Sequence, residues 1–320
     1  MKEQDRFDVI TKRQGGFQWG DSYVPSMLAV PREAPRGSRV SRLYSHKLNR
    51  TLHALSSPER VFTQLALHHP NLFELHEQKM LWPTDAPHPL EGHPQTRGQF
   101  LQPLRGTVSI AEEIGFKHHE IIVTDEWGER TRQAYPYLGD LLLYLENDQG
   151  RPYAINWTVK DTQQAFNERR ARTPKTPVQR QKDREHARLR GCLERLYYAS
   201  AGIQTIEVAK DQIPSAVEAN LDLLFNMHGL PISLDATLLE DFCGAAEDAV
   251  RAGDPLNYLA IRYGRRWGST SHFIAKIYQE IWERRIIVDF NKPILIDHPL
   301  NTDGPDLLNQ FSYLFEDVQG

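Results

Sequence analysis

The sequence predicts a mixed α/β protein with two domains. The chain has 320 residues, which is enough for two ordinary domains with buried cores. Up to about residue 228, helical and strand patterns alternate, as is typical of an α/β domain with a mixed sheet. From residue 229 onward helical patterns dominate, which indicates a second, α+β domain. We therefore expect a basic arm over residues 1–36, an α/β domain over 37–228 and an α+β domain over 229–320.

The α/β domain is expected to begin with a helix followed by a strand. In the segment SSPERVFTQLALHH (56–69), Ser56 and Glu59 have the spacing of a capping box. Four apolar residues recur there at helical spacing: Val61, Phe62, Leu65 and Ala66. The next segment, NLFELHEQ (71–78), predicts a strand.

A β-hairpin follows later in this domain. Residues 83–103 contain five prolines and predict a loop, and residues 107–115 predict a short helix. A strand over Tyr137–Glu146, a turn over Asn147–Gly150 and a strand over Pro152–Lys160 then predict the hairpin. Three further elements complete the domain: a helix over Gln181–Ser200, a strand over Ile203–Lys210 and a helix over Pro214–Gly229.

The α+β domain is expected to contain three helices and a hairpin. The helices are predicted over Leu234–Ala252, Pro255–Arg262 and Ser271–Arg285. Residues 286–297, IIVDFNKPILID, predict a strand, a turn and a second strand. Helices followed by such a hairpin are typical of a winged-helix-like domain, a fold that contacts DNA or protein.

Composition and cysteine usage indicate a soluble protein of a reducing compartment. The chain is 40% hydrophobic and 25% charged, and it contains no apolar run of about 20 residues that could span a membrane. Its two cysteines, Cys192 and Cys243, are far apart and belong to no C-x-x-C motif. We therefore expect a cytoplasmic location, without a disulfide framework or a cysteine-based zinc site.

Positive charge is concentrated in two blocks, although the net charge is −4. Met1–Arg50 contains ten Lys/Arg against five Asp/Glu, and Lys160–Arg190 contains ten against four. Such blocks can bind phosphate groups, because electrostatic attraction acts over about 10 Å at moderate salt. A solvated surface is the other interpretation of the same pattern.

Three charged residues form a candidate catalytic site. If the hairpin pairs as predicted, Asp140 lies close to the Lys160 end of the neighbouring strand. Glu59 stands at the edge of the apolar face of its helix and can approach the sheet. Two acids and a lysine placed in this way suit metal-dependent cleavage of a phosphodiester: the carboxylates bind Mg²⁺, and the lysine stabilises charge in the transition state.

Simpler interpretations exist for each of these residues. Glu59 could serve only as the capping-box partner of Ser56, and Asp140 with Lys160 could form a surface ion pair worth under about 1 kcal/mol. A zinc site is disfavoured because no H-E-x-x-H motif is present; the histidines considered for one are His68, His69, His76, His118 and His119. The phosphate-loop, dinucleotide-binding and nucleophile-elbow motifs are also absent from the sequence.

The ordered motifs resemble TnsA, the endonuclease subunit of heteromeric transposases. The resemblance covers about Gly20–Met227 and rests on "RLYSHKLNRTLHALSSPERVFTQLALHHPNLFELHEQ", "GFKHHEI", "YLGDLLLY…AINWTVK" and "LYYASAGIQTIEVAKDQIPSAVEANLDLL". It implies a restriction-endonuclease-like nuclease domain with Glu59, Asp140 and Lys160 as catalytic residues. The first two would bind Mg²⁺, for which Mn²⁺ is expected to substitute.

One position departs from the family pattern. The family has Gln two residues before its lysine, whereas this chain has Thr158. A hydroxyl is a weak metal ligand, so the backbone carbonyl of Val159 or a water molecule is expected to complete the metal site.

The resemblance also implies a role and partners. The role is to cut the non-transferred (5′) strand at transposon ends in a cut-and-paste transposition complex. The partners would be transposon-end DNA, a DDE-type transposase subunit similar to TnsB and an AAA+ ATPase similar to TnsC, in the cytoplasm of a bacterium and on the nucleoid when assembled. Two alternatives stay open: a stand-alone restriction-type nuclease, and an assembly adaptor whose nuclease site is inactive.

Overall fold

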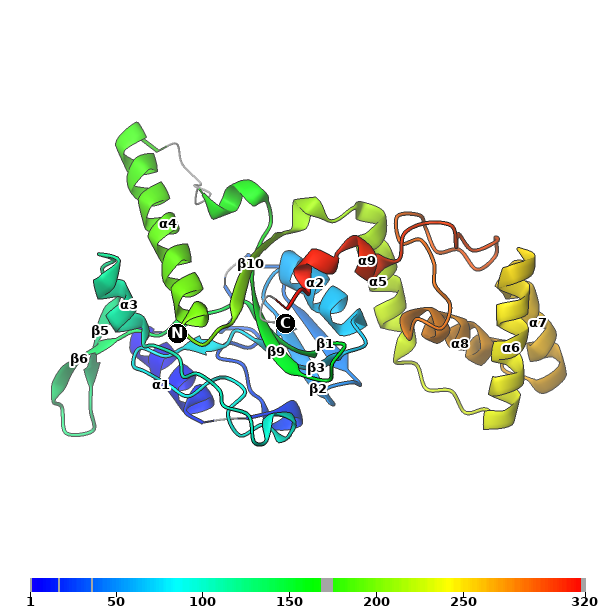
Figure 1. Cartoon of the computed structure of the whole chain (residues 1–320), viewed down its shortest axis with the longest axis horizontal. Helices are drawn as coiled ribbons and strands as arrows, with labels where there is room; N and C mark the ends of the chain where they lie inside the picture. The colour runs from blue at the N-terminus through cyan, green and yellow to red at the C-terminus, as the bar shows by residue number, and fades with distance from the viewer. Residues whose placement is uncertain (1, 17, 36, 168–174, 318–320) are drawn as a thin grey trace. The chain divides into compact units, whose positions relative to one another are not determined.

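The computed structural model describes residues 2–16, 18–35, 37–167 and 175–317, and it confirms the predicted mixed α/β class. The chain forms two compact units (Figure 1). Unit 1 contains residues 1–63, 71–212 and 316–320, and unit 2 contains residues 64–70 and 213–315. None of the helices within the described ranges is both long enough and apolar enough to cross a membrane.

A mixed four-stranded sheet forms the centre of unit 1. Its strands lie in the order β10-β9-β8-β3. The predicted hairpin is confirmed, because β8 pairs antiparallel with β9, whereas β10 runs parallel to β9. The strands are β3 (Leu72–Glu77), β8 (Leu141–Glu146), β9 (Pro152–Lys160) and β10 (Gln204–Ala209).

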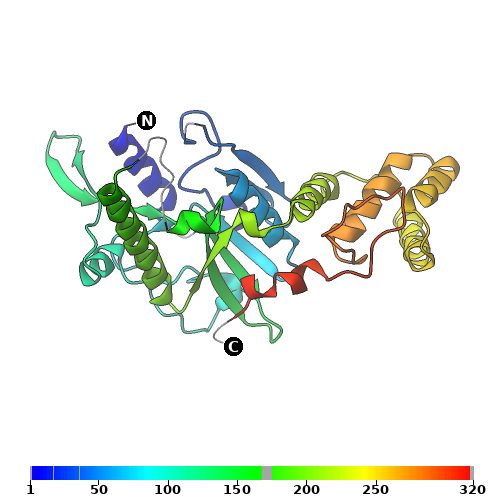
Figure 2. The same cartoon turned by 90° about the horizontal axis from the view of Figure 1, so that it is seen from above.

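Two helices cover opposite faces of this sheet. Successive side chains of β9 point to opposite faces. The Trp157 ring lies 5.9 Å from the Phe62 ring of α2 (Ser57–His68), while the Thr158 hydroxyl donates a hydrogen bond to Glu194 of α4 (Pro177–Ala199). Figure 2 shows these helices in blue and green, with the strands between them.

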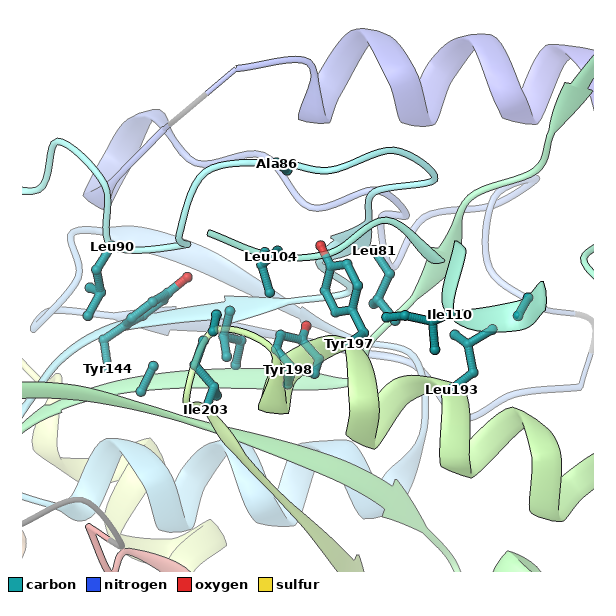
Figure 3. Close-up of a cluster of buried hydrophobic side chains, with 14 of the residues drawn as sticks. Leu81, Ala86, Leu90, Leu104, Ile110, Tyr144, Leu193, Tyr197, Tyr198 and Ile203 are labelled. Carbon is teal, nitrogen blue, oxygen red and sulfur yellow. The ribbon is translucent and has the colours of Figure 1, made fainter. Parts of the chain in front are cut away.

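The proline-rich segment over residues 83–103 forms part of the core of unit 1. It is irregular, as predicted, apart from the 3-10 turn η2 (Pro94–Thr96) and a bridge between Ala86 and Leu104. Ala86 and Leu90 are buried against the aromatic side chains of β8 and α4 (Figure 3). Burial of these apolar side chains favours the folded loop.

The described residues of the amino-terminal segment belong to unit 1, so the prediction of a separate basic arm over residues 1–36 is wrong. Helix α1 (Glu3–Gln14) buries Ile10 completely. The Gln14 side-chain amide donates a hydrogen bond of 2.6 Å to the Val24 carbonyl, which attaches the end of the helix to the following chain. Residues 1, 17 and 36 lie outside the described ranges, as do residues 168–174 of the second basic block.

Two peripheral hairpins were not predicted. One pairs β1 (Ser41–Ser45) with β2 (Arg50–Ala54), and the other pairs β5 (Glu120–Thr124) with β6 (Arg130–Ala134). The sequence of β6, RTRQA, has almost no apolar side chains, so it lacks the alternation that identifies a half-buried strand. The smaller elements of the unit are α3 (Thr107–Glu113), β4 (Met80–Leu81), β7 (Tyr137–Leu138), η1 (Gly20–Ser22), η3 (Gln163–Phe166) and η4 (Lys210–Gln212).

Unit 2 is built mainly from helices. They are α5 (Ser215–His228), α6 (Ala236–Ala252), α7 (Leu256–Trp267), α8 (Thr270–Trp282) and α9 (Leu307–Gln310), followed by the 3-10 turn η5 (Ser312–Leu314). Helix α5 packs against α8 and therefore belongs to unit 2. Unit 2 thus includes residues 213–228, which were predicted to belong to the α/β domain. It also includes the end of α2.

The strand–turn–strand predicted for residues 286–297 is wrong, since no described residue of this segment is in a strand. Buried and exposed side chains alternate only over residues 286–288 and 294–297, and the backbone between them is hydrogen-bonded to a helix side chain. The Asn220 side-chain amide of α5 donates hydrogen bonds to the carbonyls of Phe290 (2.9 Å) and Lys292 (2.8 Å), and its oxygen accepts one from the Ile294 N–H (3.1 Å). The backbone of this segment is therefore hydrogen-bonded by the Asn220 side chain instead of forming the predicted hairpin.

Candidate functional site

Glu59 lies in the first turn of α2, where it interacts with Ser56. The Ser56 hydroxyl accepts a hydrogen bond from the Glu59 N–H (3.3 Å) and donates one to Glu59 Oε1 (2.8 Å). The other carboxylate oxygen, Oε2, accepts hydrogen bonds from the Leu55 N–H (2.9 Å) and the Gln78 side-chain amide (2.8 Å). Because three hydrogen bonds reach this buried carboxylate, it is held in one orientation.

Asp140 lies at a break in the strand predicted over Tyr137–Glu146. The stretch divides into β7 and β8, with Gly139 and Asp140 between them. A Cβ atom at Gly139 would lie 3.1 Å from a tyrosine hydroxyl, so glycine suits this crowded position. At the break the Asp140 side chain meets β9, where its Oδ2 accepts a hydrogen bond of 2.7 Å from the Val159 N–H.

Lys160, the last residue of β9, reaches the same carboxylate. Its Nζ lies 3.4 Å from Asp140 Oδ2 and 3.1 Å from the Val159 carbonyl oxygen. The Lys160 and Asp140 side chains are 40% and 28% exposed. Asp140 Oδ1 receives no hydrogen bond from any residue that the structure describes. This oxygen is therefore free to bind a ligand from solution.

Gln78 connects the two acids. It follows β3 with a φ of 44°, a left-handed conformation that is uncommon for a residue with a side chain. Its backbone N–H donates a hydrogen bond of 3.0 Å to the Asp140 carbonyl, while its side-chain amide donates to the Glu59 carboxylate. One residue thus contacts the Glu59 carboxylate and the backbone of Asp140.

The charges of the three candidate residues depend on one another. Burial, followed by the negative charge of Asp140, raises the pKa of Glu59 to about 7, and Lys160 acts in the opposite direction. Asp140 raises the pKa of Lys160, so the lysine is charged at neutral pH. Because neighbouring carboxylates repel each other, this arrangement favours the binding of a further cation.

Thr158 contacts Glu194 and makes no hydrogen bond with Asp140. Its hydroxyl donates a hydrogen bond of 2.9 Å to Oε1 of Glu194 on α4, and the Asn156 side-chain amide donates to the same oxygen (3.1 Å). Arg190 Nη1 lies 2.9 Å from the other oxygen of Glu194. Glu194 is 5% exposed. Thr158 therefore belongs to a buried network between the sheet and α4.

Glu194 is the charged neighbour of the site that the sequence analysis missed. Its signal is an acid next to Leu193 and three residues before Tyr197, both of which are buried on the apolar side of α4. A carboxylate in such a position needs a partner, because burial of an unpaired charge is costly. Glu194 also contributes to raising the pKa of Lys160.

The oxygen atoms around Asp140 fit the ligands that Mg²⁺ takes. Mg²⁺ is usually bound through one or two carboxylates and keeps several water molecules. Asp140 Oδ1 can supply such an oxygen directly. Glu59 Oε1 and the Val159 carbonyl oxygen already accept from Ser56 and Lys160, so they would bind a cation through their remaining lone pairs, whereas the Thr158 hydroxyl lies against Glu194. Within the described ranges, no group of three or more His, Cys, Asp or Glu side chains is placed to hold a metal ion. Binding here would thus require water or phosphate oxygens as well.

The histidines considered for a zinc site are spread over the molecule. His76 is buried in unit 1, where its ring stacks on a tyrosine with 3.8 Å between centroids. His118 contacts a threonine hydroxyl at 2.9 Å, and His119 contacts a glutamate at 2.7 Å. His68 and His69 belong to unit 2. Each ring thus has its own surroundings.

Comparisons with known proteins assign no family to the chain. No protein-family model matches it, and no curated protein is detectably similar to it in sequence.

Proposed function

We propose that the chain is a Mg²⁺-dependent DNA endonuclease with Glu59, Asp140 and Lys160 as its catalytic residues. The observation that carries the proposal is the accessible pair of Asp140 and Lys160 at the end of β9, with the buried Glu59 joined to it through Gln78. A mixed sheet covered by α2 and α4 supports a restriction-endonuclease-like unit 1. Function follows from the site rather than from this fold.

The proposed chemistry is hydrolysis of a phosphodiester. Mg²⁺ would polarise the phosphate and favour ionisation of the attacking water. Glu59 and Asp140 would bind the cation through oxygens whose orientation α2 and β9 determine. The Lys160 ammonium would donate to a phosphate oxygen and stabilise the negative charge that develops in the transition state. The Val159 carbonyl would provide a further oxygen.

The sequence motifs that resemble those of TnsA support a more specific role. In that role the enzyme cleaves the non-transferred strand at transposon ends, together with a DDE-type transposase subunit and an AAA+ ATPase. Such an enzyme is expected to cleave little DNA by itself and to become active with its partners, since an unregulated nuclease would damage host DNA.

The test is strand-specific cleavage of end-containing DNA with Mg²⁺, by the chain alone and with transposase and ATPase. Asp140→Ala should reduce cleavage about 10²-fold or more, because it removes the accessible metal ligand. Asp148→Ala is the matched control: it removes an exposed acid from the turn of the same hairpin and should cut at the wild-type rate.

Three outcomes would change the proposal. Wild-type cleavage by Asp140→Ala would refute the assignment of the site. The absence of Mg²⁺ binding in calorimetry would favour an inactive assembly adaptor. Efficient cutting of plain plasmid by the isolated chain would favour a stand-alone nuclease.

A further inference from the structure

Unit 2 carries an unusual distribution of positive charge. It contains eight Lys/Arg against fourteen Asp/Glu and is therefore acidic. Five of its basic side chains form ion pairs within the unit: Arg251, Lys276, Arg284, Arg285 and Lys292. The other three make no ion pair with any described residue, and all three lie on α7: Arg262, Arg265 and Arg266.

These arginines share one face of α7. Together with Tyr258 and Ile261 they occupy positions i, i+3, i+4, i+7 and i+8 of the helix, which form a continuous stripe. The opposite side of the helix is buried through Leu256, Leu259 and Ala260. The exposed stripe of Tyr258, Ile261, Arg262, Arg265 and Arg266 is called the arginine face below. Figure 1 shows α7 beside α6 in unit 2.

Aromatic side chains accompany the arginine face. Tyr258 is 66% exposed, and Trp267, at the end of the helix, is 52% exposed. The Arg266 guanidinium lies over the Trp267 ring, 5.1 Å from its centroid. Large exposed aromatic residues next to unpaired arginines are typical of surfaces that contact nucleic acids, since rings pack on sugars and bases while guanidinium groups bind phosphates.

We propose that the arginine face of α7 binds the phosphate backbone of double-stranded DNA. From Arg262 to Arg266 the helix rises about 6 Å, a length of duplex that carries roughly three to four phosphate charges. An acidic peptide offers fewer charges, because same-face carboxylates recur only about every 5–7 Å along a helix or strand. DNA is thus the better match for three adjacent guanidinium groups.

The contact is expected to have little sequence preference. Phosphate contacts position a protein on the duplex and carry no sequence information directly. The arginine face contains no Asn, Gln, Asp or Glu that could read base edges. This inference goes beyond the proposed nuclease activity and does not depend on it, because binding requires neither Mg²⁺ nor the residues of unit 1.

The experiment measures binding of the full chain to a short fluorescent duplex in EDTA, over a series of salt concentrations. The variant is R262Q/R265Q. We expect its affinity to fall about tenfold or more, and its plot of log K against log salt to become shallower by about 2, since two phosphate contacts are lost. The control, R251Q/K292Q, removes two exposed but ion-paired charges from the same unit and should bind like wild type.

Two results would overturn the inference. One is wild-type DNA affinity and salt slope in R262Q/R265Q. The other is tight binding of labelled poly-glutamate by the wild type, lost equally in the variant, which would identify an acidic protein as the partner. Binding is measured in EDTA, where the proposed Mg²⁺-dependent cleavage is absent, so failure of the nuclease proposal and failure of this inference can be told apart.

Discussion

Two ion pairs of unit 1 each join a basic side chain to a carboxylate, but they differ in burial and in the distance between the charged groups. Arg50 Nη2 lies 2.9 Å from Glu77 Oε2, and both side chains are almost fully buried. Lys160 and Asp140 are 3.4 Å apart, and both are accessible to solvent. The first pair is closed and the second is open, so charge alone does not distinguish a structural pair from a candidate site.

The two pairs differ in how many carboxylate oxygens already accept hydrogen bonds. Both oxygens of Glu77 are bound by Arg50, at 2.9 Å each, and Oε1 also accepts a hydrogen bond of 3.0 Å from the His53 N–H. Asp140 keeps one oxygen for which no described residue provides a donor. A closed pair can only stabilise the fold, whereas an open pair can also bind a ligand.

The largest effect is expected from breaking the closed pair. Arg50→Ala would leave a buried, unpaired Glu77 and should lower the free energy of unfolding by about 3–5 kcal/mol. Lys160→Ala, at the open pair, should cost under about 1 kcal/mol. Urea denaturation measures both. The double variant R50M/E77L removes both charges and should recover more than half of the stability lost in Arg50→Ala. Equal losses of stability in Arg50→Ala and Lys160→Ala would contradict the distinction between the two pairs.

At the open pair, activity should respond more than stability. Lys160→Ala should reduce the rate of single-turnover cleavage about 10²–10³-fold, because the role proposed for the ammonium is to stabilise the transition state, while DNA affinity should change little. Lys182→Ala, which removes an exposed lysine of α4, is the control. Weak DNA binding with normal chemistry would recast Lys160 as an ordinary phosphate contact.

A buried histidine, His88, should make the stability of unit 1 depend on pH. Burial lowers the pKa of His88 to about 4, from about 6.5 in the unfolded chain. Between these values the unfolded chain binds more protons, so the free energy of unfolding should fall by up to about 3 kcal/mol as the pH drops from about 6.5 to 4.

His88→Asn isolates this contribution. Its Oδ1 can replace Nδ1 of the ring, which accepts a hydrogen bond of 3.0 Å from the Leu90 N–H. Urea denaturation at several pH values should therefore show a flatter acid limb for the variant. The same pH dependence in both proteins would assign the acid sensitivity to other groups.

The smallest effect is expected at Thr158. Thr158→Val keeps the volume and removes the hydrogen bond to Glu194, which should cost about 1 kcal/mol of stability. Cleavage should stay within about threefold of wild type, because Asn156 and Arg190 still hold Glu194. A loss comparable to that of Asp140→Ala would show that the hydroxyl positions the metal or the water.

Local patterns were sufficient to predict the hairpin that carries Asp140 and Lys160. The turn at Asn147–Gly150 and the flanking apolar runs determine its register, in which Leu141 pairs with Trp157. Asp140, which precedes Leu141, and Lys160, which follows Trp157, therefore meet at one end of the hairpin. The capping motif likewise predicted the start of α2, and thus the position of Glu59.

Features that depend on distant partners could not be predicted in this way. Glu194 contacts Thr158 from another element, 36 positions along the chain, so no local pattern reveals the contact. The segment over residues 286–297 has the alternation of a hairpin, but Asn220, about 70 residues earlier, binds its backbone. The break at Gly139 depends in the same way on packing against α4.

The position of Gln78 has a mechanical consequence. Its backbone contacts Asp140 and its side chain contacts Glu59, so the two acids, from a helix and a strand break, share one support. A displacement of the chain at residue 78 would therefore act on the Asp140 backbone and on the Glu59 carboxylate at the same time. Glu59 and Asp140 therefore move less independently than two residues on unconnected segments would. Less entropy is then lost when a ligand fixes their geometry.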